Sequence, residues 1–367
     1  MIVAIVCIYG LGALGWLFTG LIRQQKKENK EVSEPAKMQL EEITVLIPFR
    51  NESKKLPDLL KSFASSSALP AHILLVNDHS EDESLQIIQF CEQGLPLSVV
   101  SCPEGITGKK AAIRHALQSV STEFILSMDA DVVFDEMYFE KMQNLPVRDM
   151  HVLPVTMFSD SLAGNFAVVD HLLVNALNAA MAGWKRPFIC SGANLLYRKA
   201  AFISYDRYDL HKHLPSGDDT YLLRDFYSKK ASISVCSDPG LCVQTVVPSS
   251  IKKFFEQRVR WVGKTADLKD TSANTMIFFI VFLTAIFFAA LAFLVFHHRL
   301  TDALLLFVVK SVVDIIAFFP FFMRARKISL LLSIPFYEIV YPFYAVALTL
   351  AVYLISPTWK GREIRVR

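Results

Sequence analysis

The chain has 367 residues, of which 53% are hydrophobic, and a formal net charge of +3. Its mean hydropathy is positive, which is more than one soluble domain usually carries, so the composition excludes a wholly soluble protein and predicts membrane segments. The apolar residues gather at residues 1–22 and 276–355, and the middle reads as a soluble domain. We expect no nucleic-acid partner.

The first 22 residues are apolar and long enough to cross the hydrocarbon core of a bilayer, which is about 30 Å thick. They lack a basic leader and a small-residue cleavage site, so we expect an uncleaved transmembrane anchor at residues 1–22. Basic residues follow in the segment 23–42, which we expect to be a linker. By the positive-inside rule they hold the central domain in the cytoplasm of an integral protein, which we expect in a bacterial inner membrane. These residues are Arg23, Lys26, Lys27 and Lys30.

Between residues 43 and 128, short β-branched runs alternate with helical patterns. This order predicts an α/β fold, with a mostly parallel sheet and helices on both of its faces. Ligands bind such sheets at the carboxyl ends of the strands. The expected strands are 43–47, 72–76, 97–100 and 124–128, and the expected helices are 56–64, 83–91 and 110–120.

Polar clusters follow three of these four strands, at residues 48–52, at residues 77–82 and at Asp129-Ala130-Asp131. An isolated Asp-x-Asp is more often a solvated loop, but three clusters on one sheet edge make a site. Two carboxylates are hard oxygen ligands that suit Mg²⁺ or Mn²⁺ and leave positions open for phosphate oxygens. The pattern therefore indicates nucleotide-sugar chemistry.

These motifs resemble those of the membrane-bound family 2 glycosyltransferases with the GT-A fold, over about residues 43–265. The family's Pro-x-x-Asn-Glu opening is Pro48 to Glu52, and its Val-Asp-Asp-x-Ser-x-Asp turn is residues 76–82, where Asn77 departs from the usual first Asp. Gly108-Lys109 matches a helix start of the family, whereas its glycine spacing is wrong for a P-loop. The resemblance implies a GT-A catalytic domain over residues 43–250.

Three later motifs continue the resemblance. Residues 191–198 look like the family's acceptor-side loop, Asp218-Asp219 looks like its catalytic pair, and residues 257–261 match the Gln-x-x-Arg-Trp signature of membrane-embedded members. The acceptor-side residues would be Gly192, Ala193, Asn194 and Trp261. The donor-binding residues would be Pro48, Asn51, Glu52, Asp78, Lys109, Asp129, Gln257, Arg260 and Trp261.

The chemistry gives each carboxylate a role. We expect Asp131 to bind the metal directly and Asp129 to support the metal or the ribose, because negative charge develops on the leaving diphosphate. The family pattern implies that Asp78 accepts a hydrogen bond from a uracil base, although an Asx-turn explains that residue equally well. Asp219 is the candidate base for the acceptor hydroxyl, and direct attack would invert the anomeric configuration. Asp218 can also cap the following helix.

The C-terminal part predicts membrane association. Residues 251–272 read as an interfacial amphipathic helix that carries the Gln-x-x-Arg-Trp motif. Three hydrophobic segments follow within residues 275–356, at 276–296, 300–323 and 328–355. In the second, Lys310 and Asp314 lie on one helical face, where they can neutralise each other.

The topology of the last two segments stays open. Alternation through four spans would put the basic tail, residues 357–367, outside the cell, whereas its charges favour the cytoplasm. A segment that enters the membrane without crossing it would resolve this conflict.

The sequence leaves the acceptor open. Residues 357–362 are similar to the end of ceramide-type lipid glucosyltransferases, and three C-terminal segments are few for a polymer channel. We therefore expect an inverting, Mg²⁺- or Mn²⁺-dependent transfer from a UDP-sugar to a membrane lipid. A processive polysaccharide synthase is the alternative. A membrane transporter or sensor with a nucleotide-binding domain is the non-enzyme alternative.

Overall fold

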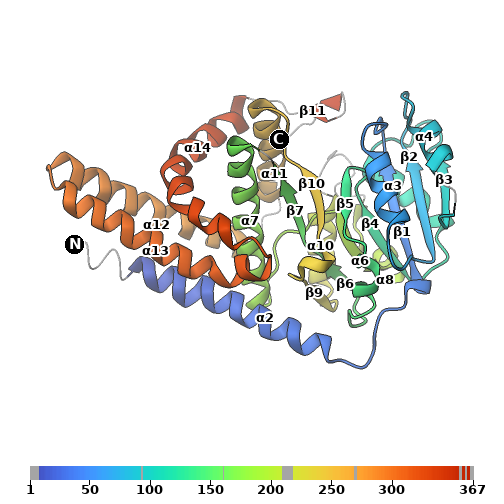
Figure 1. Cartoon of the computed structure of the whole chain (residues 1–367), viewed down its shortest axis with the longest axis horizontal. Helices are drawn as coiled ribbons and strands as arrows, with labels where there is room; N and C mark the ends of the chain where they lie inside the picture. The colour runs from blue at the N-terminus through green and yellow to red at the C-terminus, as the bar shows by residue number, and fades with distance from the viewer. Residues whose placement is uncertain are drawn as a thin grey trace.

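The computed structural model describes residues 8–91, 94–159, 161–208, 218–267 and 271–354, together with the pairs 358–359 and 362–363. The main sheet lies at one end of the molecule, and a pair of long apolar helices extends at the other end (Figure 1). Within the described residues this sheet has seven strands in the order β3-β2-β1-β4-β8-β6-β9. All neighbours pair in parallel except β8, which is antiparallel to β4 and β6. The prediction of a mostly parallel α/β sheet is confirmed.

Every strand and helix predicted before residue 128 is present, with ends that differ by a few residues at most. The strands are fully buried or nearly so in β1, β2 and β4, as expected of parallel strands covered on both faces. These elements are β1 (Ile43–Phe49), α3 (Leu56–Ala64), β2 (His72–Asn77), α4 (Ser84–Cys91), β3 (Leu97–Ser101), α5 (Lys109–Ala116) and β4 (Phe124–Met128).

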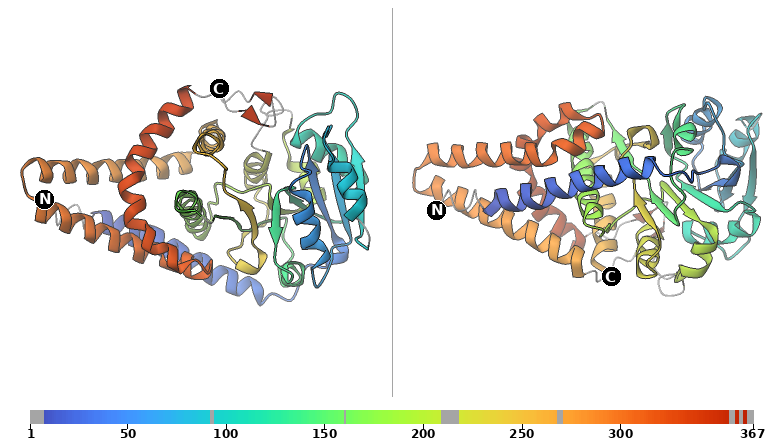
Figure 2. Two further views of the ribbon diagram at one scale, coloured as in Figure 1. Left: turned by 45° about the horizontal axis from the view of Figure 1, so that its top comes forward. Right: turned by 90° about the horizontal axis from the view of Figure 1, so that it is seen from below.

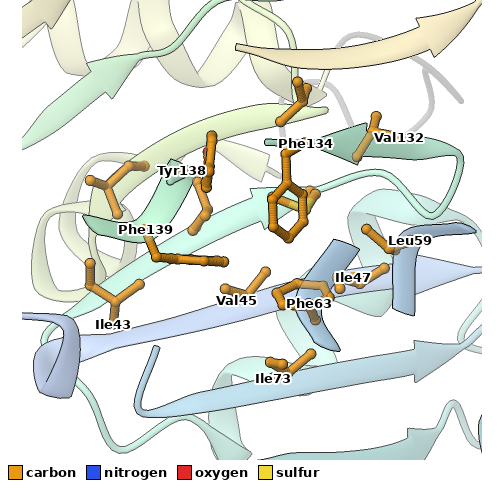
Figure 3. Close-up of a cluster of buried hydrophobic side chains, with 14 of the residues drawn as sticks. Ile43, Val45, Ile47, Leu59, Phe63, Ile73, Val132, Phe134, Tyr138 and Phe139 are labelled. Carbon is orange, nitrogen blue, oxygen red and sulfur yellow. The ribbon is translucent and has the colours of Figure 1, made fainter. Parts of the chain in front are cut away.

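An aromatic cluster fixes one face of this sheet (Figure 3). The rings of Phe63 and Phe134 meet edge to face at 4.9 Å between centroids, and Phe139 stacks on Phe63 at 5.8 Å. Such contacts add to the free energy gained by burying the rings. The cluster holds α3 and the turn after β4 against β1, so the Asp129–Asp131 turn starts from a rigid base.

The other three strands of the main sheet, β8, β6 and β9, come from the chain after residue 149, and a separate small sheet has the strand order β5-β10-β7. Helix α7 (Leu162–Gly183) lies between this small sheet and the apolar helices (Figures 1 and 2). The other strands and α-helices between residues 129 and 246 are β5 (Val132–Phe134), α6 (Tyr138–Met142), β6 (Met150–Val152), β7 (Val155–Phe158), β8 (Asn194–Arg198), α8 (Lys199–Tyr205), α10 (Asp218–Ser228), β9 (Ile233–Val235) and β10 (Val243–Val246).

The segment expected to be a linker is largely helical. Residues 19–32 form α2 (Thr19–Val32), which runs along the side of the molecule from the apolar helices toward the sheet (Figure 2). Gln24 donates to the Val235 carbonyl, and Glu28 pairs with Arg324 at 2.7 Å. The segment therefore packs as part of the domain, because its polar side chains find buried partners. Of the expected anchor, residues 1–7 lie outside the described part, and η1 (Ala13–Phe18) leads into α2.

Four described helical segments are long and apolar enough to cross a membrane. One lies in α7, where 67% of the segment is buried inside the molecule, so α7 is a core helix. The other three fall on the three predicted hydrophobic segments. They belong to α12 (Thr271–Phe296), α13 (Leu300–Arg324) and η5 (Ile328–Ser333) with α14 (Ile334–Leu354). Helix α11 (Ile251–Asp267) precedes them, and the short strands β11 (Thr358–Trp359) and β12 (Arg362–Glu363) follow.

Candidate functional site

The loops after β1 and β2 interlock at the carboxyl end of the sheet. Asn51 makes two hydrogen bonds to the loop after β2: its backbone N–H donates to the Ser80 hydroxyl, and its side-chain oxygen accepts from the Glu81 N–H. The N–H of Glu52 donates to the buried Ser84 hydroxyl at 2.9 Å. Two of the three predicted polar clusters thus form one edge. Pro48 stands just before it, within β1.

Asp78 joins this edge to the start of α5. Its side chain is buried, and its Oδ2 accepts the Gly108 backbone N–H at 3.0 Å. Gly108 has a φ of 93°, which favours glycine, so the tight approach suits this residue. The uracil contact of Asp78 remains a prediction. Any base that reaches this carboxylate does so beside the Gly108-Lys109 turn.

Asp129 interacts with two cationic side chains, one through an ion pair and one through longer-range electrostatics. The Lys109 ammonium is 2.6 Å from its Oδ1, with the Asp129 side chain 37% exposed and that of Lys109 17% exposed. Burial lowers the pKa of Arg260, while the negative charges of Glu256 and Asp129 oppose this shift. Arg260 is therefore within electrostatic reach of Asp129, so the structure brings the Gln-x-x-Arg-Trp motif to the Asp-x-Asp turn. Gln257 lies one helical turn before Arg260 on α11.

Asp131 follows in the same turn, with an exposed side chain. Among the described residues, no group of three or more His, Cys, Asp or Glu side chains could hold a metal ion. The donor set that fits a divalent cation is thus the Asp129–Asp131 carboxylate pair with the remaining positions filled by phosphate oxygens, as Mg²⁺ and Mn²⁺ sites on nucleotides require. The residues present fit a metal that binds together with a diphosphate.

Asp219 lies in the first turn of α10 and contacts the predicted acceptor-side loop. Its Oδ2 accepts the Gly192 N–H at 3.0 Å, and its Oδ1 accepts the Thr220 N–H at 2.7 Å. Gly192 is in turn fixed to β4, because its carbonyl accepts the Ser127 hydroxyl at 3.0 Å. The carboxylate is therefore held in one orientation. Helix α10 begins at Asp218, whose side chain lies outside the described part.

Asn194 was predicted to contact the acceptor, which requires an accessible side chain, but the structure places it in the interior. Its side chain is fully buried, its amide donates to the carbonyls of Pro154 and Leu241 at 2.8 and 2.9 Å, and its oxygen accepts the Tyr138 hydroxyl. It therefore anchors the loop. Ala193 beside it is also buried. Of the three residues of this loop that were predicted to contact the acceptor, Gly192 is the one that bonds to Asp219.

A large cavity opens on the Asp219 side of the site. It has a volume of about 1280 Å³ and is lined by Asp219 and Ser191 at one part and by residues of the N-terminal helix and of α12, α13 and α14 at others. Pockets that hold drug-sized ligands have volumes of about 300–1,000 Å³, so this space exceeds what one sugar needs. The cavity joins the candidate base to the apolar helices.

Trp261 lines this cavity, as does Arg258. Arg258 pairs with Asp170 of α7 at 2.7 Å, and the Tyr337 hydroxyl of α14 donates to the same carboxylate at 2.8 Å. The Arg258 guanidinium lies over the Trp261 ring at 4.3 Å. Sequence reasoning found the motif but missed Asp170 and Tyr337, because no local pattern links residues so far apart in the chain.

Residues 44–205 match the model of the family "Glycosyl transferase family 2". This part of the chain is therefore similar to a family 2 glycosyltransferase domain. The matched range holds the Asn51, Asp78, Lys109, Asp129 and Asp131 positions, whereas Asp219 and the Gln-x-x-Arg-Trp motif lie after it.

The relatives extend beyond this range. A poly-β-1,6-N-acetyl-D-glucosamine synthase of Staphylococcus aureus (strain COL) is 21% identical over 259 residues, covering 68% of this chain and 60% of the relative. The synthase of Staphylococcus epidermidis (strain ATCC 35984) is 21% identical over 254 residues, with the same coverage. The chain spans about 60% of the length of the curated relatives it matches.

A solved structure supports the fold. The mannosyltransferase PcManGT from Pyrobaculum calidifontis, in complex with GDP-Man and Mn²⁺, is 15% identical, with a TM-score of 0.51, and the match covers 92% of this chain and 99% of that chain. At this identity the likeness shows the fold alone. The α/β domain is therefore GT-A-like, as the sequence motifs predicted.

Proposed function

We propose that this chain is an inverting glycosyltransferase that moves a sugar from a nucleotide-diphosphate donor to a membrane lipid at the cytoplasmic face. The cavity is the observation that supports the lipid acceptor, because it runs from Asp219 to the apolar helices. The family 2 domain and the relatives support the transfer chemistry. They also disfavour the transporter or sensor alternative, which needs none of the candidate carboxylates.

The donor side of the site consists of Asp129, Asp131, Lys109 and Arg260. A divalent cation held by the two carboxylates would supply positive charge to the diphosphate as it leaves. Lys109 and Arg260 can donate to diphosphate oxygens, since Lys109 pairs with Asp129 and Arg260 is within electrostatic reach of it. The neighbour PcManGT was solved with GDP-Man and Mn²⁺, which supports a divalent cation without choosing between Mg²⁺ and Mn²⁺.

On the acceptor side, Asp219 takes the proton. The acceptor oxygen forms a bond to the anomeric carbon while the bond from that carbon to the diphosphate oxygen breaks, and the hydroxyl proton passes to the Asp219 carboxylate. Backbone N–H groups of Gly192 and Thr220 orient the carboxylate. Because no enzyme nucleophile intervenes in this scheme, the configuration inverts and an α-linked donor gives a β-linked product.

The test is a donor screen with the full chain in lipid, starting with UDP-sugars and measuring release of nucleoside diphosphate. We expect Asp219→Asn to bind donor normally and to turn over at least about a hundredfold more slowly, the scale for losing a general base. Asp131→Ala should lose the dependence on added Mg²⁺ or Mn²⁺ together with the activity. Full turnover in both variants would contradict the assignment, and loss of donor binding in Asp219→Asn would remove the base role.

A processive polysaccharide synthase is the second candidate, because the matched relatives are named poly-β-1,6-N-acetyl-D-glucosamine synthases. The size of the product separates the two. A single transfer gives one lipid species that is heavier by one sugar in mass spectrometry, whereas processive synthesis gives a ladder that grows with time.

A further inference from the structure

The ion pair between Lys109 and Asp129 occupies a carboxylate that the metal site needs. The 2.6 Å contact joins the ammonium to Oδ1 of Asp129, and the lysine side chain is only 17% exposed. Lys109 is the first residue of α5 (Lys109–Ala116), directly after the left-handed Gly108. Its backbone is therefore fixed, while its flexible stem allows the ammonium to move.

The charges at this turn disfavour a metal that arrives alone. A divalent ion at Asp129 would lie beside the Lys109 ammonium and within reach of Arg260, whose guanidinium responds to Asp129. A diphosphate that arrives alone would meet Asp129, Asp131 and Glu256, which also acts on Arg260. Like charges at such distances repel strongly where solvent is partly excluded.

Metal and donor arriving together avoid both penalties. The diphosphate of a sugar nucleotide carries two negative charges and the cation two positive charges, so the pair leaves the net charge of the site unchanged. Lys109 can then turn from Asp129 to a phosphate oxygen, which frees the carboxylate.

We propose that Lys109 acts as a counter-ion that substitutes for the metal at Asp129, so that the divalent cation binds strongly only together with the nucleotide. The inference rests on the proposed function, because it assumes a metal-dependent donor site. Under this proposal the nucleotide raises the affinity for the metal, and the metal raises the affinity for the nucleotide by the same factor, as thermodynamic linkage requires. Lys109 is thus a positioning residue for the metal as well as a donor contact.

The test measures Mn²⁺ binding to the full chain in detergent by electron paramagnetic resonance of the free ion, with no nucleotide, with UDP and with GDP. Wild type should bind Mn²⁺ weakly alone and at least about tenfold more tightly with one of the two nucleotides, within the usual range of coupling. Lys109→Met should bind Mn²⁺ alone about tenfold more tightly than wild type and should bind the nucleotide more weakly. A purely structural loss would lower both affinities.

Two control variants sharpen the result. Lys61→Met removes the same charge from an exposed position on α3 and should leave Mn²⁺ binding as in wild type. Lys109→Arg keeps the charge and should keep the weak binding of Mn²⁺ alone. An equal gain in Lys61→Met, or no gain in Lys109→Met, would overturn the role of Lys109.

The failures of the two proposals are distinguishable. If wild type binds no Mn²⁺ even with nucleotide, the proposed metal dependence fails. If wild type binds Mn²⁺ only with nucleotide but Lys109→Met binds it no better alone, the donor site stands and the counter-ion role is overturned. Tight binding of Mn²⁺ alone by wild type, with no effect of either nucleotide, would also overturn it.

Discussion

Arg258, the second residue of the Gln-x-x-Arg-Trp motif, is almost fully enclosed. Its guanidinium lies between the rings of Phe254 and Trp261 and pairs with Asp170, which also accepts the Tyr337 hydroxyl. The pair joins α11 to α7, and the hydroxyl joins α7 to α14. The motif thus holds the wall of the cavity together through Arg258, while Arg260 is within electrostatic reach of Asp129.

Removing one partner of this pair should destabilise the protein strongly. In Asp170→Asn the shape is kept but the buried guanidinium loses its counter-charge, so we expect a loss of about 3–5 kcal/mol in the free energy of unfolding. The double variant Asp170→Asn/Arg258→Met should recover much of this loss, because no uncompensated charge remains. Thermal unfolding in detergent, followed by tryptophan fluorescence, measures both.

The control for this prediction is an exposed pair. Asp302 lies 2.5 Å from Arg299, with side chains 32% and 55% exposed, so Asp302→Asn should cost less than about 1 kcal/mol. Equal effects of Asp170→Asn and Asp302→Asn would show that the buried network contributes no more than a surface ion pair.

At the scale of elements, α2 and α7 pack against each other through two glycines. A Cβ at Gly183 would lie 2.0 Å from the Gly20 carbonyl oxygen, and one at Gly20 would lie 2.7 Å from the Ala180 carbonyl oxygen. The same crossing places Arg23 over the Trp184 ring at 3.9 Å. The helices approach this closely because neither glycine carries a side chain, and this crossing attaches the N-terminal helix to the domain.

Gly183→Ala should therefore separate the two helices. The obstacle is backbone and cannot rotate away, so we expect a loss of about 2 kcal/mol or more, at the upper part of the range for overpacking. Gly15→Ala is the matched control, since nothing lies within 4 Å of its added Cβ, and alanine there favours helix. Unfolding temperatures compare the two, and a stable Gly183→Ala protein would argue against the close crossing.

The elements near the start of the domain could be read from the sequence because each carries its own pattern. Buried strands such as β1 and β4 are unbroken apolar runs, and α3 has a regular apolar face. The segment expected to be a linker could not be read, because two partners of Glu28, Arg324 and Ser237, lie far along the chain. Lys310 and Asp314 were predicted to pair, and they do at 2.7 Å, but their third partner Glu338 lies on another helix.

At the scale of the whole molecule, one cavity is lined both by residues of the α/β domain and by residues of the apolar helices. Asp219 lines this cavity, whereas Asp129, Lys109 and Arg260, the proposed donor side, are not part of its lining. The sheet-edge rule predicted the place of Asp129 because parallel strands end together, whereas Lys109 and Arg260 were predicted from the family resemblance. The cavity itself could not be predicted, since its walls come from segments at both ends of the chain.

If the acceptor enters through this cavity, filling the cavity away from Asp219 should impair transfer alone. Leu283 of α12 lines it, whereas the neighbouring Phe282 is 50% exposed on the outer side and is not part of the lining. We expect Leu283→Trp to raise the acceptor KM at least about tenfold, because a bulky ring removes room for an acyl chain. The slow hydrolysis of donor by water should not change, since the donor side is untouched.

Phe282→Trp places the same indole ring one residue away, outside the lining of the cavity, and should leave both lipid glycosylation and donor hydrolysis as in wild type. Measuring lipid glycosylation and nucleoside diphosphate release on the same preparations separates the two steps. Equal KM values in Leu283→Trp and wild type would mean that the acceptor reaches Asp219 by another path, and the cavity would no longer support a lipid substrate. A fall in donor hydrolysis would instead show that α12 and the donor side move together.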